Sequence, residues 1–196
     1  MTKRIVDLLV AALGLVILSP ALIALMIAVK LDSPGPAIFV QQRVGRGGRL
    51  FQCYKLRTMR EGTLETLTHL SSVSSVTKLG HFLRRSKLDE IPQLYNVFKG
   101  DMSLVGPRPG LPGDLPLIQA RQKLHVLNVR PGMTGLAQVC GIDMSRADVL
   151  AAVDARYVQS KSAWLDANLL VLTVVDSRHA RAKVIIEASD IKGRAA

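Results

Sequence analysis

The sequence IVDLLVAALGLVILSPALIALMIAV, residues 5–29, decides how the rest of the chain is understood. It is almost entirely apolar, and a straight helix of about 20 such residues crosses a bilayer. Basic residues stand on both sides of it, with Lys3 and Arg4 before and Lys30 after. Because Lys and Arg mark the cytoplasmic end of a membrane segment, two basic ends favour a segment that enters and leaves on the same side.

Ser19-Pro20, in the middle of this stretch, supplies the break that such a path needs, since proline lacks a backbone N–H and clashes with the preceding turn. The halves Ile5–Leu18 and Ala21–Val29 are roughly 21 and 14 Å long as helices, too short for a core of roughly 30 Å. We therefore expect residues 1–31 to form a re-entrant helix-break-helix. A single spanning helix remains the alternative, and the stretch is too long for a signal peptide.

The composition fits one membrane element followed by one compact domain. Among 196 residues, 26 Lys and Arg stand against 15 Asp and Glu, a net charge of +11 that suits an anionic partner. Anionic lipids fit a basic chain beside a membrane, whereas the scarcity of aromatic residues argues against nucleic acid. We expect a membrane-surface domain over 32–176 and a basic tail over 177–196. Cys53 and Cys140 have no metal-ligand spacing and are interpreted as buried thiols of a reducing compartment.

Short strands are predicted just after the membrane segment. Ala37–Gln41 and Leu50–Leu56 have strand character, and the basic, glycine-rich loop 44–49 between them is interpreted as a hairpin turn. A phosphate-binding loop is the alternative, but the Lys-Ser/Thr pair of such loops is missing.

Most of the remaining elements are predicted to be helical, so the fold class is α+β and mostly helical. Helical patterns cover residues 77–85, 90–98, 117–127 and 147–159, and residues 61–76 are interpreted as a surface loop or short helix. Within 90–98, an apolar stripe at helical spacing is predicted from Ile91, Leu94, Tyr95 and Phe98. The apolar stretch Ala163–Val175 contains Trp164 and is too short to span a bilayer. It is predicted to be an interfacial helix, with a buried core helix as the alternative.

Asp89-Glu90 follows a basic run and precedes a predicted helix. One interpretation makes Asp89 the N-cap of that helix, with Pro92 harmless in the first turn. The other is chemical, because a carboxylate can attack phosphorus when a cation such as Mg²⁺ and nearby Lys or Arg neutralise the charge. The sequence around Pro107-Arg108-Pro109 offers such a cation on a rigid backbone, although an exposed arginine in a proline turn explains the same pattern.

Six ordered motifs resemble the bacterial sugar transferase family, the monotopic phosphoglycosyl transferases. They are Ser19-Pro20, Asp32-Ser33-Pro34-Gly35-Pro36, Tyr54-Lys55-Leu56-Arg57-Thr58-Met59, Leu88-Asp89-Glu90-Ile91-Pro92-Gln93-Leu94, Lys99-Gly100-Asp101-Met102-Ser103-Leu104-Val105-Gly106-Pro107-Arg108-Pro109 and Arg130-Pro131-Gly132-Met133-Thr134-Gly135-Leu136-Ala137-Gln138-Val139. A weaker similarity follows at Tyr157, Ser162 and Leu165-Asp166. No single motif is specific, but six in order are.

The resemblance implies transfer of a phospho-sugar from a UDP-sugar to undecaprenyl phosphate, with release of UMP. It places this reaction at the cytoplasmic face of the bacterial inner membrane, as the first membrane step of O-antigen, capsule, exopolysaccharide or glycoprotein glycan assembly. It implies that Asp89 is the nucleophile of a covalent intermediate and helps to hold Mg²⁺. Glu90 completes the dyad, in positioning or in proton transfer.

The resemblance also implies which groups bind the donor. Arg108, within the turn formed by Pro107 and Pro109, would bind the nucleotide or its phosphates. Arg84 and Lys55 are further candidate anion contacts. The small size of the chain suggests the minimal catalytic form, without the multi-span domain of larger relatives.

The chain departs from the family after Val139. Many members have Asn-Gly-Arg followed by a Trp-Glu pair, where this chain has Cys140-Gly141-Ile142-Asp143-Met144-Ser145. We expect this region to bear on sugar choice, so the sequence does not name the sugar.

Two other functions remain as alternatives. A non-catalytic membrane-surface protein whose basic face binds anionic lipid or nucleic acid would explain the charge and the apolar segment. It would not explain the acidic pair among basic residues or the rigid Pro-Arg-Pro segment. A transferase that moves the sugar without its phosphate would release UDP in place of UMP.

Overall fold

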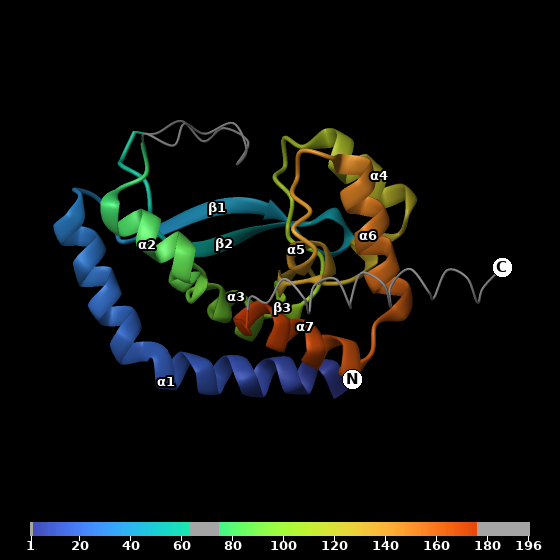
Figure 1. Cartoon of the computed structure of the whole chain (residues 1–196), viewed down its shortest axis with the longest axis horizontal. Coiled ribbons are helices and arrows are strands. Elements are labelled where there is room, and N and C mark those ends of the chain that lie inside the picture. The colour runs from blue at the N-terminus through green and yellow to red at the C-terminus, as the bar shows by residue number, and fades with distance from the viewer. Residues whose placement is uncertain (1, 63–74, 176–196) are drawn as a thin grey trace.

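The computed structural model describes residues 2–62 and 75–175, which form a long N-terminal helix and a mostly helical domain against it (Figure 1). The helices are α1 (Thr2–Asp32), α2 (Lys78–Ser86), α3 (Gln93–Lys99), α4 (Leu115–Lys123), α5 (Leu136–Val139), α6 (Ala147–Ser160) and α7 (Ala163–Val175), with 3₁₀ turns η1 (Arg46–Gly48), η3 (Leu88–Glu90) and η4 (Val126–Asn128). The strands are β1 (Ile38–Val44), β2 (Leu50–Leu56), β3 (Ser103–Val105) and β4 (Gly132–Thr134). The predicted α+β, mostly helical class is confirmed.

Helix α1 runs through Pro20 without interruption, so the expected break takes the form of a bend. Figure 1 shows a horizontal arm beginning at the N-terminus and a second arm that climbs away from it. The Ser19 hydroxyl donates to the Val16 carbonyl at 2.8 Å. Proline and such hydroxyl contacts are the usual causes of helix bends.

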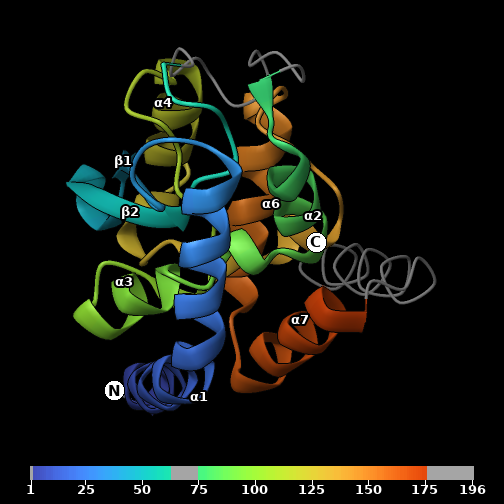
Figure 2. The same ribbon diagram turned by 90° about the vertical axis from the view of Figure 1, so that its left-hand side faces the viewer.

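Both arms of α1 are attached to the same domain. Near its start, Arg4 donates to the Val97 and Phe98 carbonyls of α3, the helix beside α1 in Figure 2, at 2.6 and 2.8 Å. One turn later the buried Asp7 accepts from the Ser103 hydroxyl at 2.8 Å and from the next backbone N–H at 3.1 Å. At the far end Arg57 donates to the Ser33 carbonyl at 2.6 Å.

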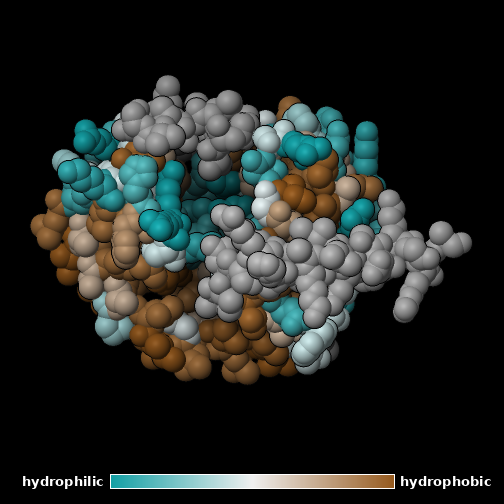
Figure 3. Space-filling view, in the orientation of Figure 1, coloured by the Kyte–Doolittle hydropathy of each residue, from teal (hydrophilic) through white to brown (hydrophobic). Residues whose placement is uncertain are grey.

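The outer surface of α1 is exposed and apolar. Figure 3 shows hydrophobic side chains along the lower and left edges of the molecule, where α1 lies. The exposed side chains include Ile5, Leu9, Leu13, Val16, Ile17, Ile23 and Ile27, each more than half exposed. The helix is long and apolar enough to cross a membrane, and only 6% of its most apolar window is buried. The core helix of a soluble protein would be mostly buried, so this exposed apolar surface favours a membrane helix over a core helix.

The predicted hairpin is confirmed, and Lys55 lies on its second strand. β1 and β2 pair antiparallel, with Phe39 opposite Lys55 and Val44 opposite Leu50. The loop between them is a turn, as predicted, in which Gly47 and Gly48 have φ of 66° and 77°. Such left-handed backbone suits glycine.

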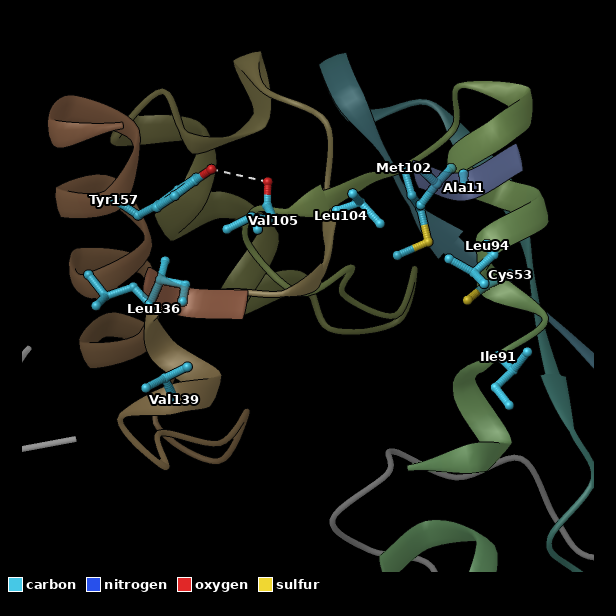
Figure 4. Packing of buried hydrophobic residues seen from close by; sticks show 12 residues of the cluster. Ala11, Cys53, Ile91, Leu94, Met102, Leu104, Val105, Leu136, Val139 and Tyr157 are labelled. Atoms are coloured by element: carbon cyan, nitrogen blue, oxygen red, sulfur yellow. Dashed lines mark hydrogen bonds between the residues drawn. The ribbon is translucent and has the colours of Figure 1, made fainter. Parts of the chain in front are cut away.

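The main core lies between the hairpin, α3, the short parallel pair β3–β4 and α6, as Figure 4 shows. The Tyr157 hydroxyl of α6 donates to the Val105 carbonyl of β3 at 3.0 Å, the dashed line in Figure 4. β3 carries the chain directly into Gly106 and the Pro107-Arg108-Pro109 segment. The core therefore fixes the base of that segment.

The helical predictions over 77–85 and 147–159 are confirmed by α2 and α6. The helix expected over 117–127 begins earlier, at Leu115, and gives way to η4 after Lys123. In α7, Leu169 is fully buried while Trp164 is 77% exposed, so the helix has one buried and one open face.

Other predictions are outside the structure or only partly met. Most of the expected loop 61–76 and the tail 177–196 fall outside the described residues. Within the described residues neither cysteine forms a disulfide; Cys53 is buried as expected, but Cys140 is only partly so.

Candidate active site

A sharp turn presents Asp89 and Glu90. Lys87 ends α2 in a left-handed conformation with φ of 58°, and the three residues of η3 follow at once. Helix α3 then begins at Gln93, with Pro92 in the N-cap position. Asp89 is therefore not a helix cap, and that interpretation is wrong. The turn instead buries Asp89 to 8% exposure.

The helix predicted from Glu90 starts later because Leu88–Glu90 forms its own 3₁₀ turn. Ile91 and Leu94 of the predicted stripe are buried. Tyr95 and Phe98 of that stripe are 49% and 44% exposed, and Val97 is fully buried instead. Gly100, with φ of 100°, ends α3 as expected.

Two cations hold Glu90. Arg108 Nη2 lies 2.7 Å from Glu90 Oε1, and Lys55 Nζ lies 3.3 Å from the same oxygen. Burial would raise the pKa of Glu90, but the charges and hydrogen bonds of Arg108 and Lys55 outweigh it and lower this pKa to about 2. Glu90 is therefore ionised and links strand β2 to the segment after β3.

Asp89 is in the opposite situation. Within residues 2–62 and 75–175 its carboxylate has no hydrogen bond or ion pair. Burial, and then the charge of Glu90, raise the pKa of Asp89, although Lys55, Arg108 and Arg84 partly oppose the rise. A desolvated carboxylate with unused oxygens, close to cations that are bound elsewhere, is available to a reactant or a metal ion.

The two cations differ in how readily they titrate. Burial, and then the charge of Arg108, lower the pKa of Lys55 although Glu90 opposes them. The charge of Glu90 raises the pKa of Arg108 further. Arg108 is thus a permanent charge, whereas the charge of Lys55 depends on its partner Glu90.

The backbone of residues 107–110 is held from outside at every carbonyl. Its four carbonyl oxygens accept, in order, from Gly132 N at 2.9 Å, Arg121 Nη1 at 2.8 Å, Arg43 Nη1 at 3.1 Å and Val44 N at 2.9 Å. Because two prolines also restrict this segment, the backbone that carries the Arg108 side chain is held in one position.

Sequence reasoning missed both arginines of this set. Arg43 is a buried residue of β1 that also donates to Gln41 Oε1 at 2.6 Å. Arg121, in α4, forms a buried ion pair with Asp154 of α6 at 2.6 Å. For Arg121 and Asp154, the only signal in the sequence was one charged residue in each of two predicted helices. Nothing in the sequence showed that these two residues form a pair.

Arg84, a predicted anion contact, lies near the dyad but is not bonded to it. Its Nε donates to the Thr58 hydroxyl at 2.8 Å. The positive charge of Arg84 partly opposes the rise in the pKa of Asp89. The structure thus brings Lys55, Glu90 and Arg108 into one network and leaves Arg84 at its edge.

A cavity of about 550 Å³ opens beside this network. Its lining includes the charged residues Arg43, Lys87, Glu90 and Arg108. The apolar part of the lining includes Met133, Ala137, Val139, Ile142, Met144, Leu150 and Leu172. Figure 3 shows a recess with hydrophilic walls in the middle of the molecule. A cavity lined by both charged and apolar groups suits a ligand that carries phosphate.

Residues Gly141–Met144 also line the cavity, and they belong to the region where the chain departs from the family pattern. Among the described residues, no three His, Cys, Asp or Glu side chains cluster as a metal site. Mg²⁺, however, is commonly held by one or two carboxylates together with water and substrate phosphates. The free oxygens of Asp89 fit that requirement.

Comparison of the sequence with known proteins places this chain in a family. The family model described as bacterial sugar transferase matches residues 1–179. The chain is 41% identical over 183 residues to a UDP-glucose:undecaprenyl-phosphate glucose-1-phosphate transferase of Caulobacter vibrioides, covering 88% of this chain and 68% of that protein. It is 39% identical to an undecaprenyl-phosphate galactose phosphotransferase of Salmonella typhimurium, covering 87% of this chain and 39% of that protein.

A third relative is the UDP-N-acetylgalactosamine-undecaprenyl-phosphate N-acetylgalactosaminephosphotransferase of Aeromonas hydrophila, 35% identical over 88% of this chain and 42% of that protein. The chain thus spans about two fifths of the length of the last two relatives. Their names share a sugar phosphate and undecaprenyl phosphate, and differ in the sugar.

These matches identify the chain as an enzyme of the phosphoglycosyl transferase type. The chain belongs to the bacterial sugar transferase family.

Proposed function

We propose that this chain transfers a phospho-sugar from a UDP-sugar to undecaprenyl phosphate and releases UMP. The names of its relatives support these substrates. One structural observation carries the proposal further: Asp89 is buried and unpaired in the described part of the chain, while its neighbour Glu90 binds the two nearest cations. The product would begin the assembly of a surface glycan.

In the first half-reaction an Asp89 oxygen attacks the β-phosphorus of the UDP-sugar. The bond from that phosphorus to the oxygen bridging the two phosphates breaks, and UMP leaves with the bridging oxygen. The phospho-sugar remains on Asp89 as an acyl phosphate. Because Asp89 is desolvated and has no hydrogen-bond partner to give up in the described chain, it starts close to its reactive state.

Lys55 and Arg108 face the charge that develops on the donor phosphates. Their positions are set by Glu90, and the base of Arg108 is fixed by the hydrogen bonds to residues 107–110. Preorganised cations of this kind stabilise phosphoryl transfer without rearranging during the reaction. Mg²⁺ held by Asp89 would neutralise further charge on the diphosphate.

In the second half-reaction an oxygen of undecaprenyl phosphate attacks the same phosphorus and the bond to Asp89 breaks. The product is undecaprenyl diphosphate carrying the sugar, and the Asp89 carboxylate is restored. Glu90 serves as the positioning group, since its low pKa keeps it ionised and bound to both cations. A group so firmly deprotonated is poorly suited to donating a proton.

The phosphate of the acceptor lies at the membrane surface. The way in which α1 is attached to the domain supports the same location for the enzyme. Arg4 and Asp7 bind one arm of α1 to the domain, and Arg57 binds its far end. A domain that holds both ends of an apolar helix lies on one side of the bilayer. We therefore place α1 as a re-entrant element at the cytoplasmic face, with its bend at Pro20 in the membrane.

The proposal is tested by measuring nucleotide release with undecaprenyl phosphate and Mg²⁺. The donor panel is UDP-glucose, UDP-galactose, UDP-N-acetylglucosamine and UDP-N-acetylgalactosamine. We expect UMP from at least one donor, and at least a thousandfold slower release by Asp89→Asn. Asp148→Asn, at an exposed site on α6, makes the same chemical change and should match the wild type.

UDP as the product would mean transfer of the sugar alone. Near-normal UMP release by Asp89→Asn would remove Asp89 from the chemistry. A labelled sugar that stays covalently on the wild-type protein, but not on Asp89→Asn, would identify the intermediate directly.

A further inference from the structure

A second cavity of about 550 Å³ lies at the turn end of the hairpin. Arg46, Arg49 and Arg130 line it, together with Gly100 and Asp101 at the end of α3. Leu50 also lines this cavity and stands five residues from Lys55 on β2, roughly 17 Å at 3.4 Å per residue. The cavity is therefore separate from the active site.

Two of these guanidinium groups each donate a hydrogen bond through one nitrogen, and their other nitrogens have no partner in the described part of the chain. Arg46 donates through Nε to the Asn128 carbonyl at 2.9 Å, and Arg130 through Nε to the Gly100 carbonyl at 2.8 Å. Their Nη atoms, and the whole guanidinium of Arg49, bind no other side chain or carbonyl in residues 2–62 and 75–175. The free ends form the planar fork of donors that matches phosphate oxygens.

The acidic residue of the lining does not neutralise these arginines. Asp101 is paired with Lys99 at 3.2 Å and also accepts from Asn96 Nδ2 at 3.4 Å. Three guanidinium groups thus face the cavity with one carboxylate that already has a partner. The cavity has an excess of positive charge and favours a multiply charged anion.

The cavity also adjoins the start of the membrane helix. A Cβ atom placed on Gly100 would lie 3.2 Å from Arg4 Nη2, so Gly100 stands between Arg4 of α1 and Arg130 of the cavity. Phosphates of lipid headgroups lie at the depth where a re-entrant helix begins.

We propose that this arginine pocket binds a phosphate group, with the headgroup of an anionic phospholipid as its source. The phosphate chemistry follows from the pocket alone. The lipid source rests on the membrane placement given under Proposed function. Occupation would hold the hairpin turn, and with it the strand that carries Lys55, close to the membrane surface.

The test uses the full chain in neutral detergent and native mass spectrometry. The probes are phosphatidylglycerol, phosphatidylcholine and inorganic phosphate. The pocket variant combines Arg46→Gln with Arg49→Gln, both at exposed positions. The control combines Lys123→Gln with Arg146→Gln, which removes the same charge from exposed positions outside the lining. Circular dichroism confirms that both variants are folded.

We expect phosphatidylglycerol to bind the pocket variant at least tenfold more weakly than the wild type, with the control within twofold. In a second outcome, the pocket variant also weakens the binding of inorganic phosphate, and phosphatidylglycerol is not preferred over phosphatidylcholine. That outcome would support the phosphate site but with a soluble ligand. Equal weakening in pocket variant and control, or in neither, would overturn the proposal. No sugar donor enters this assay, so its result is independent of the proposed reaction.

Discussion

At the scale of single residues, the same cations act differently on two adjacent carboxylates. Glu90 binds Lys55 and Arg108 directly, and its pKa falls to about 2. Asp89 loses water to burial, feels the charge of Glu90, and has a raised pKa. In the proposed mechanism, a dyad divided in this way has one permanent anion that positions cations and one reactive carboxylate.

This division predicts the pH dependence of the first half-reaction. Attack needs Asp89 deprotonated, so the rate should rise with pH through a pKa above the ordinary 3.8 of an aspartate. The rate should fall again as Lys55 loses its proton, below the ordinary 10.5 of a lysine. Single-turnover UMP release without acceptor checks this, because the acceptor phosphate titrates near pH 6 by itself.

Lys55→Arg is the diagnostic variant for this profile. A guanidinium does not titrate in this range, so the alkaline limb should move upward or disappear while the acid limb stays. An unchanged alkaline limb in Lys55→Arg would show that another group controls it.

Glu90→Gln should lower stability in a pH-dependent manner. The unfolded chain binds a proton on Glu90 below pH 4.5, and the folded chain only below about pH 2. The stabilisation is therefore present above pH 4.5 and is lost as the pH falls toward 2. A pKa difference from 4.5 to about 2 corresponds to on the order of 3 kcal/mol, at roughly 1.4 kcal/mol per pH unit.

Thermal unfolding in detergent between pH 6 and pH 3 measures this effect. The difference between wild type and Glu90→Gln should shrink as the pH is lowered. Asp148→Asn gives the background for an exposed carboxylate. A difference that stays constant with pH would contradict the assignment of the low pKa to Glu90.

At the scale of elements, α4 and α6 together support the active site. Arg121 of α4 pairs with Asp154 of α6 and donates to the Arg108 carbonyl at 2.8 Å. Arg121→Lys keeps the charge beside Asp154 but loses the fork that reaches both partners. We expect a rise of about tenfold in KM for the UDP-sugar, because Arg108 loses a support, and a smaller change in kcat.

The exposed Arg146→Lys is the matched control for that measurement. Asp154→Leu should be more severe, since it leaves a buried guanidinium unpaired at a cost of about 3–5 kcal/mol. If Arg121→Lys lowered the unfolding temperature but left KM unchanged, Arg121 would act on stability alone.

Elements were predictable from the sequence where local pattern determines them. Alternation and glycines gave the hairpin, and periodicity gave α2 and α6. The cap assigned to Asp89 failed because the left-handed Lys87 starts a separate 3₁₀ turn, and a lysine in that conformation has no sequence signature. The buried face of α3 was misjudged because Tyr95 and Phe98 look like core residues, whereas tertiary packing selected Val97 and Asn96.

The candidate site shows the same limit. The motifs identified Asp89, Glu90 and Arg108 as functional groups, but not which of them pair. Contacts such as Arg43 to the Pro109 carbonyl, 66 residues apart, depend on the tertiary fold. The arginine pocket likewise joins the hairpin turn to Arg130, so the glycine-rich loop alone correctly indicated only a turn.

At the scale of the whole molecule, α1 is a bent helix that is attached to the same domain near both of its ends. As a straight helix its 31 residues would extend roughly 46 Å, which exceeds the thickness of the hydrocarbon core. Arg4 and Asp7 at one end and Arg57 at the other nevertheless contact a single domain. The bend at Pro20 allows both attachments, so the membrane path of α1 and the packing of the domain depend on each other.

We therefore predict that both ends of α1 face the cytoplasm. Single cysteines at Thr2 and Leu31, exposed positions near each end, should react with a membrane-impermeant maleimide in inside-out vesicles and not in intact spheroplasts. The background carries Cys53→Ser and Cys140→Ser. Pro20→Ala should straighten α1, and because a straight helix cannot keep both attachments, the cysteine at position 2 should become reactive from outside. Labelling of position 2 from the outside in the protein that keeps Pro20 would show a spanning helix. Unchanged labelling in Pro20→Ala would show that the path of α1 is determined by the attachments at Arg4, Asp7 and Arg57 more than by the proline.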